Sequence, residues 1–70
     1  MKEVRSEVAG NVWKITSAVG DTVSEGDTLI IVESMKMEIP VEATRSGVIK
    51  EIRVAEGEAI AEGLVVAVIG

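Results

Sequence analysis

The chain has 70 residues, seven basic and twelve acidic side chains, a net charge of −5, and neither cysteine nor histidine. This composition excludes disulfides and metal sites built on thiolate or imidazole ligands. The basic residues are scattered along the chain, so we expect no binding to nucleic acid or to a membrane surface, since both need a basic cluster.

The apolar residues favour β-sheet. Twelve Val and eight Ile outnumber two Leu and one Trp, and Phe and Tyr are absent. Because β-branched side chains suit strands better than helices, we expect almost no helix. The length predicts a single domain over residues 1–70. The lack of cysteine, of a targeting segment and of any apolar run near the ~20 residues that span a bilayer predicts a cytoplasmic protein.

Along the chain, aliphatic runs alternate with stretches rich in glycine, serine and acidic residues. The latter predict turns at Gly20–Asp27, Thr44–Gly47 and Gly57–Gly63. The aliphatic runs predict six strands, at Glu3–Glu7, Asn11–Thr16, Thr28–Val32, Ile39–Ala43, Val48–Val54 and Leu64–Ile69.

The two halves of the chain repeat one pattern. Gly20–Gly26 reads Gly-acid-x-aliphatic-x-acid-Gly, and Gly57–Gly63 repeats it 37 positions later, with aliphatic residues on both sides at the same offset. We expect the glycines to form tight corners, Val23 and Ile60 to fill the core, and the acidic residues to face water. A phosphate-binding loop is not expected, because the spacing matches no nucleotide-binding motif and acidic neighbours repel phosphate.

Two similar halves packed face to face predict an all-β fold. We expect a flattened β-barrel or sandwich of two quasi-twofold-related four-stranded sheets. On this plan both termini lie at one pole and the middle of the chain forms a hairpin tip at the opposite pole. Lys36 lies outside the repeated segments, because its equivalent would fall beyond the last residue.

The middle of the chain reads Glu33-Ser34-Met35-Lys36-Met37-Glu38. As one strand with its flanking runs it would be longer than the ~10 residues at which strands usually stop, so we expect a turn at Met35-Lys36. Two-residue turns normally use Asn-Gly or Gly-X, so Met-Lys indicates selection for something other than folding. The alternative is one ordinary strand with Met35, Met37 and Ile39 inward and Ser34, Lys36 and Glu38 in water.

The residues of this segment support little catalysis. Ser34 has no histidine to activate it, and a chain this small has little room for a cleft beside the carboxylates of Glu33 and Glu38. We therefore do not expect an enzyme, and we predict no metal site. Lys36 offers a primary amine that can be acylated, and Met35 and Met37 offer soft apolar surface for a partner.

Glu33-Ser34-Met35-Lys36-Met37 resembles the Glu-Ala-Met-Lys-Met biotinylation sequence of biotin carboxyl carrier domains. The resemblance extends along nearly the whole chain, including Gly10-Asn11-Val12-Trp13 and both glycine-rich turns. It implies that biotin protein ligase joins biotin covalently to Lys36, with Glu33, Ser34, Met35, Met37 and Glu38 as recognition neighbours. It also implies a non-catalytic, monomeric carrier that takes carboxybiotin from a biotin carboxylase to a carboxyltransferase site.

The chain departs from that family pattern in small ways. Ser34 replaces the usual alanine, and the constant offset leaves no room for the extra thumb loop of some acetyl-CoA carboxylase carriers. Lipoyl domains and small free-standing biotin/lipoyl attachment proteins are similar in fold and length. Lipoate attached to Lys36 by a lipoylating enzyme, alone or besides biotin, is therefore one alternative. An unmodified interaction module with a methionine-rich tip is another.

Overall fold

The computed structural model describes residues 1–70 and contains eight strands and no helix, which confirms the all-β prediction. No helix is therefore present that could cross a membrane. The strands are β1 (Lys2–Arg5), β2 (Gly10–Ile15), β3 (Thr22–Val23), β4 (Thr28–Ser34), β5 (Met37–Glu42), β6 (Gly47–Ile52), β7 (Ala59–Ile60) and β8 (Val65–Ile69).

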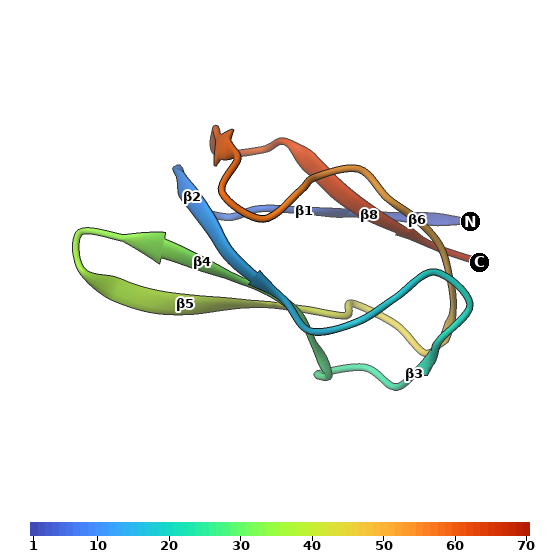
Figure 1. The fold of residues 1–70 in the computed structure, drawn as a ribbon. Coiled ribbons are helices and arrows are strands. Elements are labelled where there is room, and N and C mark those ends of the chain that lie inside the picture. Colours follow the sequence, from blue (N-terminus) through green and yellow to red (C-terminus); the bar gives the residue numbers. More distant parts are fainter.

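The strands form two four-stranded antiparallel sheets, as predicted. The terminal sheet has the order β1-β8-β6-β3 and contains both chain ends, while the hairpin sheet has the order β5-β4-β2-β7 (Figure 1). Strands β1 to β4 in one sheet order correspond to β5 to β8 in the other, and the reverse, so that β1-β8-β6-β3 becomes β5-β4-β2-β7. The quasi-twofold relation inferred from the sequence repeat is thus present in the strand topology.

The turns of each half are hydrogen-bonded to a strand of the other half. The N–H of Gly20 donates to the carbonyl of Ile49 at 2.8 Å, and the N–H of Gly57 donates to the carbonyl of Val12 at 2.7 Å. Gly20 and Gly57 adopt φ of 97° and 87°, a conformation that favours glycine. Because each half supplies hydrogen-bond acceptors for the turn of the other half, the turns of both halves are complete only when the two halves are packed together.

The sequence did not predict two of the eight strands. β3 and β7 lie inside stretches predicted as turns, yet they pair with β6 and β2 at the sheet edges. Each has two residues, which is too short for any periodicity to show. The first strand is predicted to reach Glu7 but ends at Arg5. The N–H of Ser6, just beyond it, still donates a hydrogen bond to the carbonyl of Leu64.

Aliphatic side chains from both sheets fill one core. Val23 and Ile60 are 7% and 6% exposed, so both predicted core positions are buried. The fully enclosed large side chains come mainly from the central strands β4 and β8 and from β2 and β6 beside them. The core cluster comprises Val4, Val12, Val23, Leu29, Ile30, Val32, Val41, Ala43, Ile49, Val54, Ile60, Val66, Ala67 and Ile69.

Val23→Ala and Ile60→Ala should each lower the free energy of unfolding by about 1–3 kcal/mol, because each removes apolar surface from the closed core. Urea unfolding with an unchanged m-value measures this loss. Thr22→Ala, at the exposed neighbouring position, is the control. A loss below about 0.5 kcal/mol for both core variants, the size of an ordinary surface effect, would show that the two residues do not support the core.

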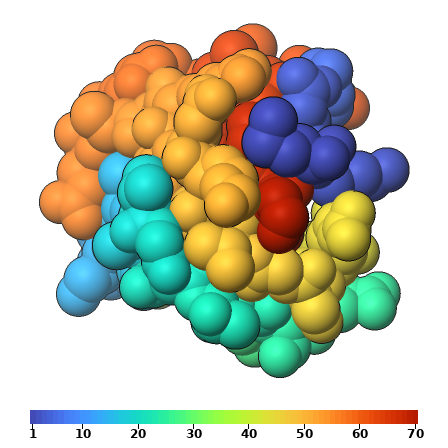
Figure 2. Space-filling model, turned by 90° about the vertical axis from the view of Figure 1, so that its right-hand side faces the viewer, coloured from blue at the N-terminus to red at the C-terminus, as the bar shows by residue number.

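The molecule is elongated, with principal extents of 31 × 17 × 16 Å. The tip of the β4–β5 hairpin and the two termini lie at opposite ends of it (Figure 1). Figure 2 shows the terminal end, where the first residues lie beside the last ones. Lys2 of β1 pairs with Ile69 of β8 there. The predicted placement of the hairpin opposite the termini is therefore correct.

Candidate attachment site at the hairpin tip

The hairpin between β4 and β5 is closed by a two-residue turn. Ser34 pairs with Met37, which leaves Met35 and Lys36 as the central residues. Their φ angles are 51° and 65°, and they are the only non-glycine residues in the chain with positive φ. Two successive positive values are the signature of a type I′ turn. The chain therefore turns at the predicted position.

This turn is built from residues that resist its conformation. The left-handed region costs a non-glycine residue roughly 1–2 kcal/mol, and Asn-Gly or Asp-Gly would avoid most of that cost. Strain of this kind collects at functional sites, where the surrounding structure maintains it. Met35 and Lys36 are thus retained at the tip against the preference of the turn itself.

Lys36→Ala should change the free energy of unfolding by less than about 0.5 kcal/mol, because an exposed side chain at the tip packs little. Lys36→Gly should be more stable than Lys36→Ala by about 0.5–1 kcal/mol, since glycine relieves the left-handed strain but frees the unfolded chain. Urea unfolding of the two variants side by side measures the difference. Equal stability would mean that the turn is unstrained at this position.

The side chains at the tip are open to solvent. Lys36 is exposed and its side chain makes no hydrogen bond or ion pair, while Met35 and Met37 are 89% and 58% exposed. The alternative of an ordinary strand with inward methionines is therefore wrong for both. Ile39 alone of that set is half-buried. Figure 1 gives the reason, because the hairpin extends past the opposite sheet and nothing covers its end.

The remaining predicted recognition residues lie where the strands meet the turn. Glu33 and Glu38 are direct cross-strand partners, both exposed and neither in an ion pair. Like charges placed opposite each other destabilise a strand pair. Ser34 is half-buried and its hydroxyl has no hydrogen-bond partner. The tip therefore carries one positive charge, that of Lys36, between two carboxylates.

The hairpin is held firmly along β4, up to the residues next to its turn. β4 lies between β5 and β2, and its Leu29, Ile30 and Val32 have no exposed surface. Gly10 of β2 lies so close to β4 that a Cβ atom there would collide with the carbonyl oxygen of Glu33, and would lie 2.9 Å from Val32 Cγ1. The tip thus projects from a fixed strand pair.

The close approach of Gly10 to β4 is a feature of the site that the sequence did not predict. A signal was present, because the repeat equates it with Gly47, where a Cβ atom would lie 2.6 Å from the carbonyl oxygen of Gly70. Each of these glycines lets β2 or β6 approach the neighbouring strand closely. Only Gly10 does so beside the hairpin, at Glu33 near the turn.

The chemistry available at the tip is that of one amine. No group of three or more potential metal ligands occurs in the structure. A primary amine that is exposed, unpaired and held on a tight turn is suited to amide formation with a carboxylic acid, which removes the positive charge of the lysine. The residues at the tip therefore fit a covalently attached acid such as biotin or lipoate.

Residues 2–69 match the sequence profile of the biotin/lipoyl family described as "Biotin-requiring enzyme". This match covers nearly the whole chain and decides its family. The chain belongs to the biotin/lipoyl attachment family.

Individual members of this family are similar over most of their length. The "Biotin/lipoyl attachment protein" of Bacillus subtilis is 47% identical over 60 residues, which cover 86% of this chain and 82% of that protein. A "Biotinylated protein TB7.3 homolog" of Mycobacterium leprae is 40% identical over 68 residues, which cover 97% of this chain and 96% of that protein. Both relatives are nearly as small as this biotin/lipoyl domain.

A solved structure agrees with the fold in detail. A segment of the Kluyveromyces lactis urea carboxylase superposes with a TM-score of 0.94 at 43% identity, covering 99% of this chain and 6% of that chain. The predicted family, the all-β fold and covalently bound biotin are confirmed by these matches. They also confirm a carrier component of biotin-dependent carboxylases in place of a catalytic one.

Proposed function

We propose that Lys36 is the lysine that biotin protein ligase acylates, and that the domain then presents its biotin to the sites of a biotin carboxylase and a carboxyltransferase. The observation that carries this proposal is the tip itself. Lys36 is exposed, makes no ion pair, and occupies a strained two-residue turn at the end farthest from the termini. Met35, Met37, Glu33, Ser34 and Glu38 surround it as the surface that the ligase recognises.

The other lysines are poorer targets. Lys2 and Lys14 lie within β1 and β2, on the surfaces of sheets. Lys50 lies in β6, and its side chain runs beside the C-terminal Gly70. An enzyme can enclose a projecting two-residue turn in a pocket, whereas a strand lysine is surrounded by its sheet. This difference selects Lys36 among four lysines.

The fold supplies what a carrier needs. When attached, biotin supplies the reversible binding of carbon dioxide, while the chain supplies position. The buried strand β4 holds the hairpin, and the exposed tip lets the attached group enter a partner's site without unfolding of the domain. Acylation removes the only positive charge of the tip, so the modified tip carries only Glu33 and Glu38.

We include in this proposal a single domain over residues 1–70 that is monomeric in the cytoplasm. Its longest exposed sheet edge is β5, where Pro40 lacks the N–H that a further strand would need. This arrangement opposes edge-to-edge pairing of two copies. A chain without cysteine needs no oxidising compartment to fold.

A second candidate is lipoylation of the same lysine, alone or besides biotinylation. The observation that favours it is the 47% identity to a relative named "Biotin/lipoyl attachment protein". A lipoylating enzyme would attach lipoate to the same amine. The unmodified interaction module is a third candidate, and it predicts that Lys36→Ala leaves function intact, whereas both carrier functions predict its complete loss.

The test is the intact mass of the protein after incubation with a biotin protein ligase, biotin and ATP, and separately with a lipoate ligase and lipoate. The expected result is one added biotinyl group per chain. A mass increase in the lipoate reaction alone would mean that the domain carries lipoate and not biotin. A mass increase in both reactions would establish dual modification. No addition in either would contradict both carrier functions.

A further inference from the structure

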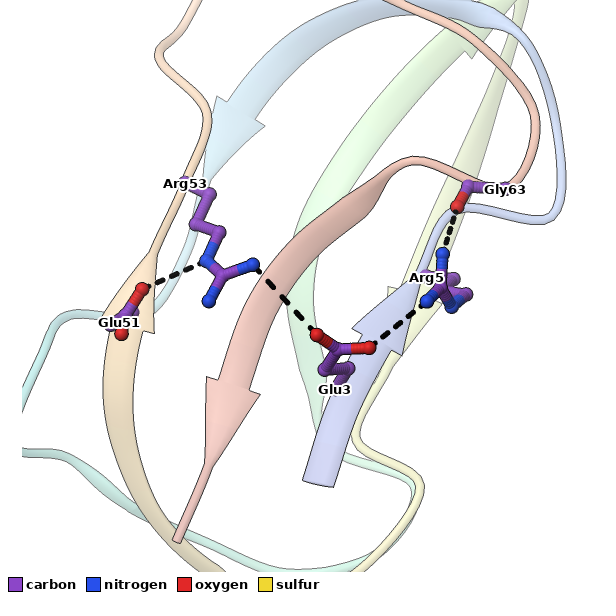
Figure 3. Close-up of polar contacts among 5 residues, drawn as sticks. All are labelled: Glu3, Arg5, Glu51, Arg53 and Gly63. Atoms are coloured by element: carbon purple, nitrogen blue, oxygen red, sulfur yellow. Dashed lines mark hydrogen bonds and ion pairs between the residues drawn. The ribbon is translucent and has the colours of Figure 1, made fainter. Parts of the chain in front are cut away.

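The outer face of the terminal sheet is covered by charged side chains. Val68 of β8 shares this face with Glu3 and Glu51 by register, and it is only 4% exposed although it lies outside the core cluster. Figure 3 shows an ion-paired network that spans β8, from Glu3 and Arg5 of β1 on one side to Glu51 of β6 and Arg53 just after that strand on the other. Its contacts are Arg5 Nη2–Glu3 Oε1 at 2.9 Å, Arg53 Nη1–Glu3 Oε2 at 3.9 Å and Arg53 Nε–Glu51 Oε1 at 2.8 Å.

The two arginines of this network are paired with its two glutamates. Arg5 also donates to the carbonyl of Gly63 at 2.8 Å, and the hydrogen bond from Arg53 to Glu51, with the charge of Glu51, raises the pKa of Arg53. Such exposed ion pairs contribute little to stability. Their effect here is to cover Val68 with groups that prefer water to a protein partner.

The hairpin sheet lacks this network, because Glu42, Lys14 and Thr16 stand where the other half has Arg5, Glu51 and Arg53. Part of its outer face is apolar instead. By the offset of 37 residues, Pro40 stands where the other half has Glu3, Trp13 where it has Lys50, and Ile31 where it has Val68. Ile31 pairs with Pro40 of β5 and with Lys14 of β2, and Trp13 occupies the bulge beside Lys14. We name the surface formed by Trp13, Ile31 and Pro40 the Trp13 face.

The Trp13 face is uncovered. Trp13, the only aromatic residue of the chain, is 48% exposed and lies outside the core cluster. Pro40 is exposed and Ile31 half-buried, and no ion pair crosses them. The other half shows that this backbone accepts charged residues at the positions of Trp13 and Pro40. The apolar residues are therefore not required by the fold, and exposed apolar clusters of this kind mark interaction sites.

The Trp13 face leads directly to the hairpin tip. Glu33 follows Ile31 by two residues in β4, and Glu38 precedes Pro40 by two residues in β5, so both lie on the same outward side as the Trp13 face. The equivalent positions in the other half are Gly70 and Met1, so the acidic pair is also specific to this sheet. Apolar surface, two carboxylates and the amine of Lys36 thus follow one another along a single hairpin.

We propose that the Trp13 face is the docking surface for the ligase that acylates Lys36. An apolar patch on the ligase would contact this face, and basic residues at the border of that patch would meet Glu33 and Glu38. This inference rests on the proposed function of Lys36. A ligase must act on Nζ itself, which is only four methylenes from the backbone, so its surface must lie against the hairpin. A carboxylase acts on the far end of the completed arm and needs no such contact. The charge of the acidic pair makes a basic border the complementary one.

The test compares the kinetics of biotinylation of the full chain by a biotin protein ligase. Trp13→Lys and Pro40→Glu each install a residue of the charge found at the equivalent position of the other half, so the fold accepts them. Trp13→Lys should raise the KM for the chain about tenfold, as expected for loss of a central aromatic anchor. Pro40→Glu should raise the KM in the same direction, because it places a charge within the apolar patch, and kcat should be unchanged in both variants. Val19→Lys is the matched control, because Val19 is 62% exposed in a turn away from this face, and it should stay within twofold.

A second readout does not depend on the modified product. The Lys36→Arg chain cannot be acylated but keeps the Trp13 face, so it should inhibit biotinylation of the wild-type chain competitively, and adding Trp13→Lys should remove that inhibition. Unchanged KM and unchanged inhibition would overturn the docking proposal and leave the face to a carboxylase or a second copy. A wild-type chain that is not biotinylated at all would instead refute the attachment site, and this proposal with it.

Discussion

Lys36→Arg should abolish the incorporation of biotin by a biotin protein ligase. Arginine keeps the positive charge and the long stem, but its guanidinium stays protonated and is no nucleophile for amide formation. The turn should persist, because Lys36 makes no contact with its side chain that arginine would lose. The mass of the variant after incubation with ligase, biotin and ATP measures the result, with no added group expected.

The controls are Lys2→Arg, Lys14→Arg and Lys50→Arg, which remove the other lysines one at a time. Each should still accept one biotinyl group per chain. Full incorporation into Lys36→Arg would mean that a strand lysine or the N-terminal amine is the acceptor. The hairpin tip would then have no role in attachment.

Leu29→Ala should cause one of the largest losses of stability among single substitutions in this chain. Leu29 has no exposed surface and lies in β4, the strand that leads to the tip. Truncating a fully buried leucine costs about 2–5 kcal/mol, because apolar contacts are lost and a cavity remains. A chain of this length has a total stability of only about 4–10 kcal/mol. Urea unfolding should show a much lower midpoint with the same m-value.

Leu64, the other leucine of the chain, provides the matched control. It is 39% exposed and lies outside the core cluster, so Leu64→Ala should cost less than about 1 kcal/mol. Similar losses for the two leucines would contradict the core described here. A partly unfolded Leu29→Ala chain should also lose biotinylation, since β4 positions the hairpin.

The repeat made most of the fold predictable from the sequence. A constant offset between Gly20–Gly26 and Gly57–Gly63 required two equivalent halves, and Val23 and Ile60 could be assigned to the core from their place within those motifs. The length of the aliphatic run around Met35-Lys36 required a turn there. These inferences rest on local chemistry and chain length, which the sequence displays directly.

Other features depend on contacts between distant segments. The two-residue strands β3 and β7 exist only because β6 and β2 lie beside them, so no local pattern marks them. The role of Gly10 depends on the carbonyl of Glu33 in a neighbouring strand. The Trp13 face depends on the strand register, which places Ile31 of β4 beside Pro40 of β5. It also depends on the ion pairs of the other half, where the equivalent of Pro40 is the charged Glu3 and the equivalent of Ile31 is covered.

The central claim, that Lys36 is the acceptor of biotin, is tested most directly by mapping the modified residue. Cleavage of the biotinylated chain after glutamate releases Ser34–Glu38, a peptide with a single lysine. Tandem mass spectrometry should find the biotinyl group on Lys36 in this peptide and on no other. A biotinyl group on Lys2, Lys14, Lys50 or the N-terminus, with Ser34–Glu38 unmodified, would contradict the assignment of the hairpin tip as the attachment site.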